Sequence, residues 1–187
     1  MKLDPRRVAI LISGRGSNMR ALVEQADGYE VVLVASNKPQ AEGLDWARGR
    51  GLPTWTFDSG TIERARFDAF LGDVIEGHSV GTIALAGYMR ILSPAFIRRF
   101  EDRIVNIHPS LLPKYRGLDT HQRAIDAGDL AAGCSVHLVT EEVDAGEVLG
   151  RTEVAIMVSD TAQTLSERVL AAEHILYPRV LREFVAR

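Results

Sequence analysis

The chain has 187 residues, which is enough for one domain with a single sizeable core. Its net charge of −3 argues against a nucleic-acid partner, and its one cysteine, Cys134, excludes an internal disulfide and a cysteine zinc cluster. Because no apolar stretch approaches the ~20 residues of a membrane span and the N-terminus lacks a signal-peptide pattern, we expect a cytoplasmic protein without a membrane partner.

The first half of the chain alternates apolar runs with segments of helical period. Strands are expected at 8–13, 29–36, 53–58 and 80–87. Helices are expected between them at 17–25, 40–50 and 62–76. Since short connections join these elements, the pattern predicts a parallel sheet with helices on both faces.

The second half departs from this alternation. A short helix at 94–100, a strand at 103–108 and a helix at 119–127 come first. Strands at 133–140 and 147–156 are separated by only six residues, too few for a helical crossover, so they should pair antiparallel. A long helix at 161–187, disturbed near Pro178, ends the chain. The predicted fold class is one α/β domain over residues 1–187, with a Rossmann-like, mostly parallel sheet and an antiparallel C-terminal strand pair.

The loop "SGRGSN" lies between the first strand and the first helix. Glycines allow close approach of the backbone to a ligand, and free N–H groups at a helix N-terminus attract anions, so Gly14, Gly16, Ser17 and Asn18 resemble a phosphate cradle. The alternative is a tight turn in which Ser17 or Asn18 caps the helix. The stretch matches neither a P-loop nor the GxGxxG dinucleotide motif.

The stretch "GYMRILSP", residues 87–94, follows the fourth strand at the same sheet edge. One interpretation is an ordinary loop in which Ser93 caps a helix that starts at Pro94. The other is that the apolar side chains Met89, Ile91 and Leu92 line a pocket for a flat ligand. Composition alone does not separate the two interpretations.

Two polar side chains end the strand at 103–108. Asn106 and His108 alternate with apolar neighbours and therefore face the same side. Asn can donate a hydrogen bond to a developing oxyanion, and His can transfer a proton near neutral pH. A lone His is more often structural, but this pair at a ligand-binding sheet edge favours catalysis. Asp144 and Gly146 lie in the turn between the last two strands, where Asp-Ala-Gly also suits a simple hairpin turn.

Four stretches together resemble the phosphoribosylglycinamide formyltransferases of purine biosynthesis, a folate-dependent family. They are "ISGRGSN", "AGYMRILSP", "NIHPSLLPKYRG" and "GCSVHLVTEEVDAGEV", and the resemblance extends over about residues 8–177. It implies transfer of the formyl group of 10-formyltetrahydrofolate, the cosubstrate, to the amine of phosphoribosylglycinamide. No metal is expected. The resemblance further implies that residues 1–100 hold the phosphate and that residues 101–187 carry catalysis and folate binding.

The resemblance also assigns site residues by position. The implied catalytic set is Asn106, His108 and Asp144. Phosphoribosylglycinamide contacts fall on Gly16, Ser17, Asn18 and Glu173. Folate contacts fall on Arg64, Met89, Arg90, Ile91, Leu92, Asn106, Glu141, Val143 and Asp144. In the implied mechanism Asn106 and protonated His108 stabilise an oxyanion, while Asp144 favours the charged imidazole.

Three rival functions share parts of this pattern. Methionyl-tRNA formyltransferase has the same Asn-x-His-Pro-Ser-Leu-Leu-Pro motif, which occupies residues 106–113 here. It also has an additional basic C-terminal domain, which we do not expect in this acidic chain. Formyltetrahydrofolate hydrolase has a regulatory domain before its core, whereas only seven residues precede Val8 here. A non-catalytic nucleotide-binding module is the third, and the intact Asn106, His108 and Asp144 argue against it. The sequence leaves open whether the chain forms a homodimer.

Overall fold

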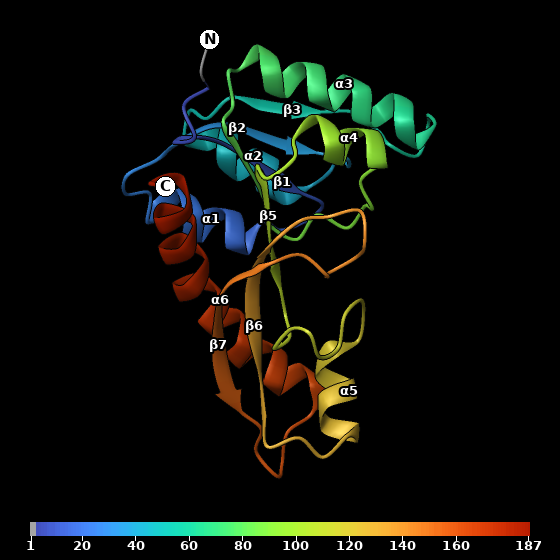
Figure 1. The fold of residues 1–187 in the computed structure, drawn as a ribbon, viewed down its shortest axis with the longest axis vertical. Coiled ribbons are helices and arrows are strands. Elements are labelled where there is room, and N and C mark those ends of the chain that lie inside the picture. Colours follow the sequence, from blue (N-terminus) through green and yellow to red (C-terminus); the bar gives the residue numbers. More distant parts are fainter. Residues whose placement is uncertain (1–2) are drawn as a thin grey trace.

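A computed structural model describes residues 3–187 as one sheet flanked by helices (Figure 1). The strands are β1 (Arg7–Ile12), β2 (Glu30–Ser36), β3 (Thr54–Thr56), β4 (Thr82–Leu85), β5 (Ile104–His108), β6 (Ala131–Leu138) and β7 (Val148–Ala155). The helices are α1 (Ser17–Glu24), α2 (Glu42–Gly49), α3 (Arg64–Gly77), α4 (Pro94–Arg99), α5 (Thr120–Asp126) and α6 (Ala162–Val185). Each expected element is present, and its ends differ from the expected ones by at most two residues. No helix within residues 3–187 is long and apolar enough to cross a bilayer.

The strand order is β3-β2-β1-β4-β5-β6-β7. Strands β1 to β5 run parallel, and β6 pairs antiparallel with β7, as expected from their short connection. Strand β6 also pairs antiparallel with β5, which the sequence pattern did not predict. The carboxyl ends of β1, β4 and β5 therefore lie side by side, at the edge of an open α/β sheet where ligands bind.

Side chains of β1 alternate between two hydrophobic cores because a strand has a period of two residues. Val8, Ile10 and Ile12 join the core that includes side chains of α1, α2 and α6. Ala9 and Leu11 join the core under α3 and α4. All five side chains are fully buried, so β1 lies between two helical layers, as the predicted parallel sheet requires.

Tyr177 of α6 ties the helix to the strands that lead to the site. Its fully buried hydroxyl lies 3.1 Å from two backbone carbonyl oxygens, those of Leu85 at the end of β4 and of Val105 in β5. Burial raises the pKa of this phenol well above its ordinary value, so the hydroxyl remains a donor. These two contacts hold the end of β4 and the residue before Asn106 in β5 against α6.

The expected disturbance of the last helix near Pro178 is wrong, because α6 continues through it. Proline lacks an N–H group, which leaves the carbonyl of the residue four positions earlier without its helical partner. That carbonyl belongs to His174, and the side-chain amide of Gln25, at the end of α1, donates to it at 3.0 Å. A tertiary contact thus replaces the missing helical hydrogen bond.

Candidate active site

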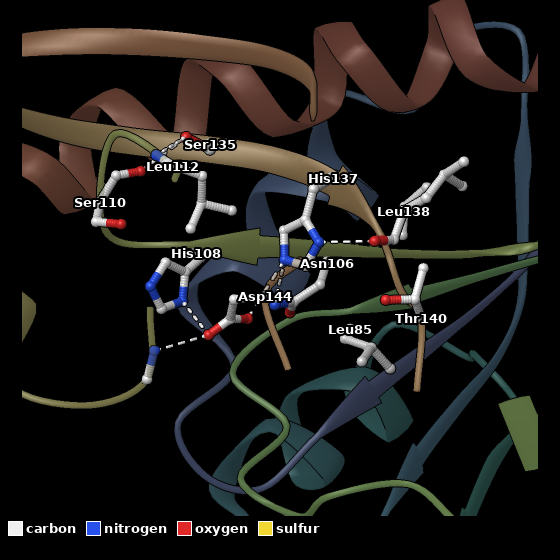
Figure 2. Close-up of polar contacts among 12 residues, drawn as sticks. Leu85, Asn106, His108, Ser110, Leu112, Ser135, His137, Leu138, Thr140 and Asp144 are labelled. Carbon is white, nitrogen blue, oxygen red and sulfur yellow. Dashed lines mark hydrogen bonds and ion pairs between the residues drawn. The ribbon is translucent and has the colours of Figure 1, made fainter. Parts of the chain in front are cut away.

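Asn106 and His108 stand on one face of β5, where the sheet changes from parallel to antiparallel pairing (Figure 2). In the register of β5 with β6, Asn106 lies opposite His137 and His108 lies opposite Ser135. His108 is buried and Asn106 half-buried. The strand therefore holds both side chains rigidly, as a reacting centre requires.

Asp144 joins this pair from the loop between β6 and β7. Its Oδ2 lies 3.3 Å from His108 Nδ1 and accepts the Gly117 N–H at 2.9 Å. Its Oδ1 lies 3.5 Å from His137 Nε2. The backbone of Asp144 has φ of +51°, a strained left-handed conformation of the kind that gathers at functional sites. The structure thus brings the three predicted catalytic side chains together.

Both ring nitrogens of His108 face acceptors. Nε2 lies 3.0 Å from the Tyr115 carbonyl oxygen, and Nδ1 faces the Asp144 carboxylate. A carbonyl oxygen can only accept, so Nε2 carries a hydrogen and Nδ1 is the nitrogen that gains or loses the second proton. The charged imidazolium satisfies both contacts at once.

The pKa of His108 reflects a competition. Burial lowers it, and the Tyr115 carbonyl and the Asp144 charge act in the opposite direction without fully offsetting burial, so the pKa lies below its ordinary value. The expected effect of Asp144 on the imidazole has the right sign but is not the largest contribution. For Asp144 itself, burial raises the pKa, while the contacts with His137, Gly117 and the His108 ring more than offset it and leave the pKa below its usual range.

His137 and Ser135 complete the centre, and sequence reasoning missed both. His137 Nδ1 donates to the Leu138 carbonyl at 2.7 Å, which leaves Nε2 to accept from Asn106 Nδ2 at 3.2 Å (Figure 2). Ser135 Oγ donates to the Ser110 carbonyl at 2.7 Å and accepts the Leu112 N–H at 3.0 Å. The available signal was the alternation of Ser and His in "GCSVHLVT", which places both side chains on one face.

The loop after β4 presents apolar side chains to solvent. Met89 is 68% exposed and Ile91 60% exposed, whereas Leu92 is buried. Arg90 is half-buried, with its guanidinium over the Phe67 ring. Ser93 caps α4 by accepting the Phe96 N–H, and Pro94 is the first helical residue, as the sequence predicted. The capping and the ligand-lining interpretations are thus compatible.

A second cluster of polar side chains lies at the 14–18 loop, between β1 and α1. The residue before α1 is Gly16 in a left-handed conformation, so the alternative in which Ser17 or Asn18 caps the helix is wrong. Asn18 instead donates from Nδ2 to Glu173 Oε2 at 2.6 Å. Burial raises the pKa of Glu173, and the Asn18 contact only partly opposes this. Beside this loop lies a cavity of about 170 Å³ lined by Ser13, Gly14, Arg15, Lys38, Gln40, Ala41 and Glu42, of which only Gly14 had been predicted as a site residue.

The other predicted folate residues lie at exposed positions. Glu141 and Val143 are exposed in the Asp144 loop, where Glu141 forms an ion pair with Arg98 of α4. Arg64 is exposed at the first position of α3. A cavity of about 400 Å³ is lined by the Pro109–Tyr115 segment, and its lining does not include Asn106, His108 or Asp144. Within residues 3–187, no three His, Cys, Asp or Glu side chains are grouped so as to hold a metal ion.

The sequence matches a known family over nearly its whole length. The family model described as formyl transferase matches residues 6–181. The chain belongs to the formyl transferase family. Phosphoribosylglycinamide formyltransferase of Escherichia coli K12 is 40% identical over 182 residues, which cover 95% of this chain and 86% of that protein.

Longer relatives and solved structures extend the comparison. The trifunctional purine biosynthetic protein adenosine-3 of Bos taurus is 44% identical over 181 residues, and this formyl transferase spans only 18% of its length. The crystal structure of phosphoribosylglycinamide formyltransferase from Brucella melitensis has a TM-score of 0.92 at 47% identity, covering 97% of this chain and 96% of that one. The comparison confirms the Rossmann-like α/β fold.

In this formyl transferase the candidate groups line one edge of the sheet. The 14–18 loop follows β1, the 87–93 loop follows β4, and Asn106 and His108 end β5. Because β1, β4 and β5 are neighbours in the sheet, the catalytic pair lies next to the 87–93 loop, with the N-terminal loop one strand further along.

Proposed function

We propose that this chain transfers the formyl group of 10-formyltetrahydrofolate to the amine of N1-(5-phosphoribosyl)glycinamide. The products are the formylglycinamide ribonucleotide and tetrahydrofolate, a step of de novo purine (IMP) biosynthesis. The observation that carries the proposal is the His108–Asp144 pair, 3.3 Å between Nδ1 and Oδ2, beside Asn106 at the carboxyl edge of the sheet. The relatives named phosphoribosylglycinamide formyltransferase support the choice of substrates.

The two substrates are assigned to different loops along the carboxyl edge of the sheet. Residues 1–100 contribute the phosphate site at Gly16, Ser17 and Asn18, with Glu173 of α6 near the ribose-glycinamide. The folate contacts are assigned to the 89–92 loop, Arg64, Asn106, Glu141, Val143 and Asp144, and the reacting groups come from residues 101–187. The N–H groups at the start of α1 and the positive end of its dipole favour an anion at the first site.

The reaction needs one bond formed and one broken at the formyl carbon. The neutral amine attacks this carbon, giving a tetrahedral intermediate with a negative oxygen. Asn106 Nδ2 has two hydrogens, of which His137 uses one, so the second can donate to the oxyanion. The bond to the folate nitrogen then breaks, and that nitrogen takes the proton released by the amine. A donor of this kind lowers the barrier by about 3–4 kcal/mol.

His108 supplies positive charge at the reacting centre. Its Nδ1 is the titrating nitrogen, because the Tyr115 carbonyl holds a hydrogen on Nε2. As an imidazolium it stabilises the oxyanion by its charge, and a water beside the ring carries the amine proton toward the departing folate nitrogen. Asp144 orients the ring and stabilises its charged form.

A spectrophotometric assay tests this function. We expect turnover when the protein is mixed with 10-formyltetrahydrofolate and phosphoribosylglycinamide, and none with formate and ATP in place of the folate. His108→Ala should abolish turnover, while His78→Ala, on the C-cap of α3, should not. Turnover that requires formate and ATP would refute the folate-dependent reaction.

A charge placed in the 87–93 loop should weaken folate binding. Ile91 is exposed in the free protein, so Ile91→Asp should fold normally, but the folate ring would bury its carboxylate without a partner. We expect the dissociation constant for the folate, measured by calorimetry, to rise about tenfold or more, and that for phosphoribosylglycinamide to change little. Val158→Asp, at a fully exposed position after β7, is the matched control. Unaltered folate affinity would show that the loop has only a structural role.

We also propose a cytoplasmic location and a homodimeric assembly. A cytoplasmic location agrees with the buried, unpaired Cys134. A homodimer is the simplest assembly beyond the monomer, and sedimentation at increasing protein concentration distinguishes the two states.

A further inference from the structure

The loop Tyr88–Ser93 holds apolar side chains in an unfavourable position. Met89 and Ile91 are both more than half exposed, although burial would be favourable for each. A flexible loop could turn such side chains inward. The backbone of this loop is nevertheless fastened near both ends by buried polar side chains, which come from other parts of the chain.

Ser13, directly after β1, fastens the first end. Its hydroxyl accepts the Met89 N–H at 2.8 Å and donates to Asn37 Oδ1 at 2.6 Å, and its own N–H donates to the Gly87 carbonyl at 3.1 Å. Ser13 and Asn37 are both buried. Asn37 in turn donates to Ser59 Oγ at 3.3 Å, so this end belongs to a network across the ends of β1, β2 and β4.

Asp68 of α3 fastens the second end. Its Oδ2 accepts the Ser93 N–H at 2.6 Å, and its side chain is almost completely buried. Within the described residues 3–187, its Oδ1 has no hydrogen-bond partner. Burying a carboxylate with so few partners is costly, and such a cost is typical of residues that are retained for function.

We propose that Ser13 and Asp68 are positioning residues for the folate, which act through the Met89 and Ser93 amides. The proposal rests on the proposed function, because it takes the 88–93 loop as the wall of the folate site. Two fixed amides hold the loop in its binding conformation before the ligand arrives, so that binding does not have to order it. Loss of an anchor should therefore weaken folate binding more than it slows the chemical step.

Steady-state kinetics of three variants and a control test the proposal. Ser13→Ala and Asp68→Ala should each raise the KM for 10-formyltetrahydrofolate about tenfold, with kcat and the KM for phosphoribosylglycinamide changed about twofold or less. Asp68→Asn retains an accepting oxygen and should restore a KM near that of the wild type. Thr82→Val removes a buried hydroxyl that donates to the Pro5 carbonyl at the opposite end of β4, and should leave both KM values unchanged.

Amide hydrogen exchange supplies a readout that does not need activity. Ser13→Ala should speed exchange at Met89, and Asp68→Ala at Ser93, whatever reaction the protein catalyses. If Asp68→Ala does not fold, Ser13→Ala, which removes one oxygen atom, carries the test alone. Equal increases in both KM values, or a fall in kcat with folate KM unchanged, would overturn the positioning role. A wild-type protein without formyl transfer would instead refute the proposed function, and the exchange data would still report on the anchors.

Discussion

Asp144→Asn should shift the titration of His108 to lower pH and reduce kcat about 100-fold. The Asp144 charge raises the pKa of His108 against the larger opposing effect of burial. Asparagine has the same shape but no charge, so burial would act with less opposition and the pKa would fall further below its ordinary value. Because the imidazolium is lost as pH rises through this pKa, the alkaline limb of the kcat profile should move to lower pH.

The titration can be followed by NMR in the free protein, with the His108 signal assigned from a His108→Asn variant. Glu142→Gln is the matched control, because it removes a carboxylate from the same loop, where Glu142 pairs with the exposed Arg116. The affinities for both substrates should change only modestly in Asp144→Asn. A His108 titration that is identical in wild type and Asp144→Asn would contradict the link between the two side chains.

Gly16→Val should raise the KM for phosphoribosylglycinamide by about 10- to 100-fold while leaving the folate KM within about twofold. Gly16 has φ of +72°, which a β-branched side chain adopts only with strain. A Cβ there would lie 2.8 Å from Met19 Cε and 3.3 Å from the Gly43 backbone. The start of α1 would have to move, and with it the N–H groups proposed to hold the phosphate.

Gly51→Val separates this local effect from general backbone strain. Gly51 has nearly the same φ, +74°, at the end of α2, and no heavy atom lies within 4 Å of an added Cβ. Both variants should lose stability in thermal unfolding through backbone strain, Gly16→Val the more because of its close contacts, but only Gly16→Val should change the KM. Asn18→Ala, which removes the contact with Glu173, should act in the same direction as Gly16→Val. An equal rise in both KM values would show that the N-terminal loop does not bind the phosphate selectively.

The order and type of the elements could be predicted from the sequence because they follow from local periodicity. Apolar runs such as "VAILIS" and the glycine- and proline-marked ends of helices depend on neighbouring residues only. The same holds for the Ser93 cap before Pro94 and for the common face of Asn106 and His108. The short connection between β6 and β7 also made their antiparallel pairing predictable.

The assembly of the centre depended on contacts between distant segments. His137 lies beside Asn106 only because β6 pairs with β5 in one register, and a shift of one residue would turn it to the other face. The Tyr115 carbonyl and the Gly117 N–H reach His108 and Asp144 through the path of a loop, and main-chain groups of this kind leave no signature in residue type. Burial, which lowers the pKa of His108 despite the nearby carboxylate, is likewise a property of the packed chain. The sequence by itself therefore determined the elements and the polar residues at their ends. The tertiary structure decided which of those residues are in contact, which hydrogen bonds they form and in which direction their pKa values move.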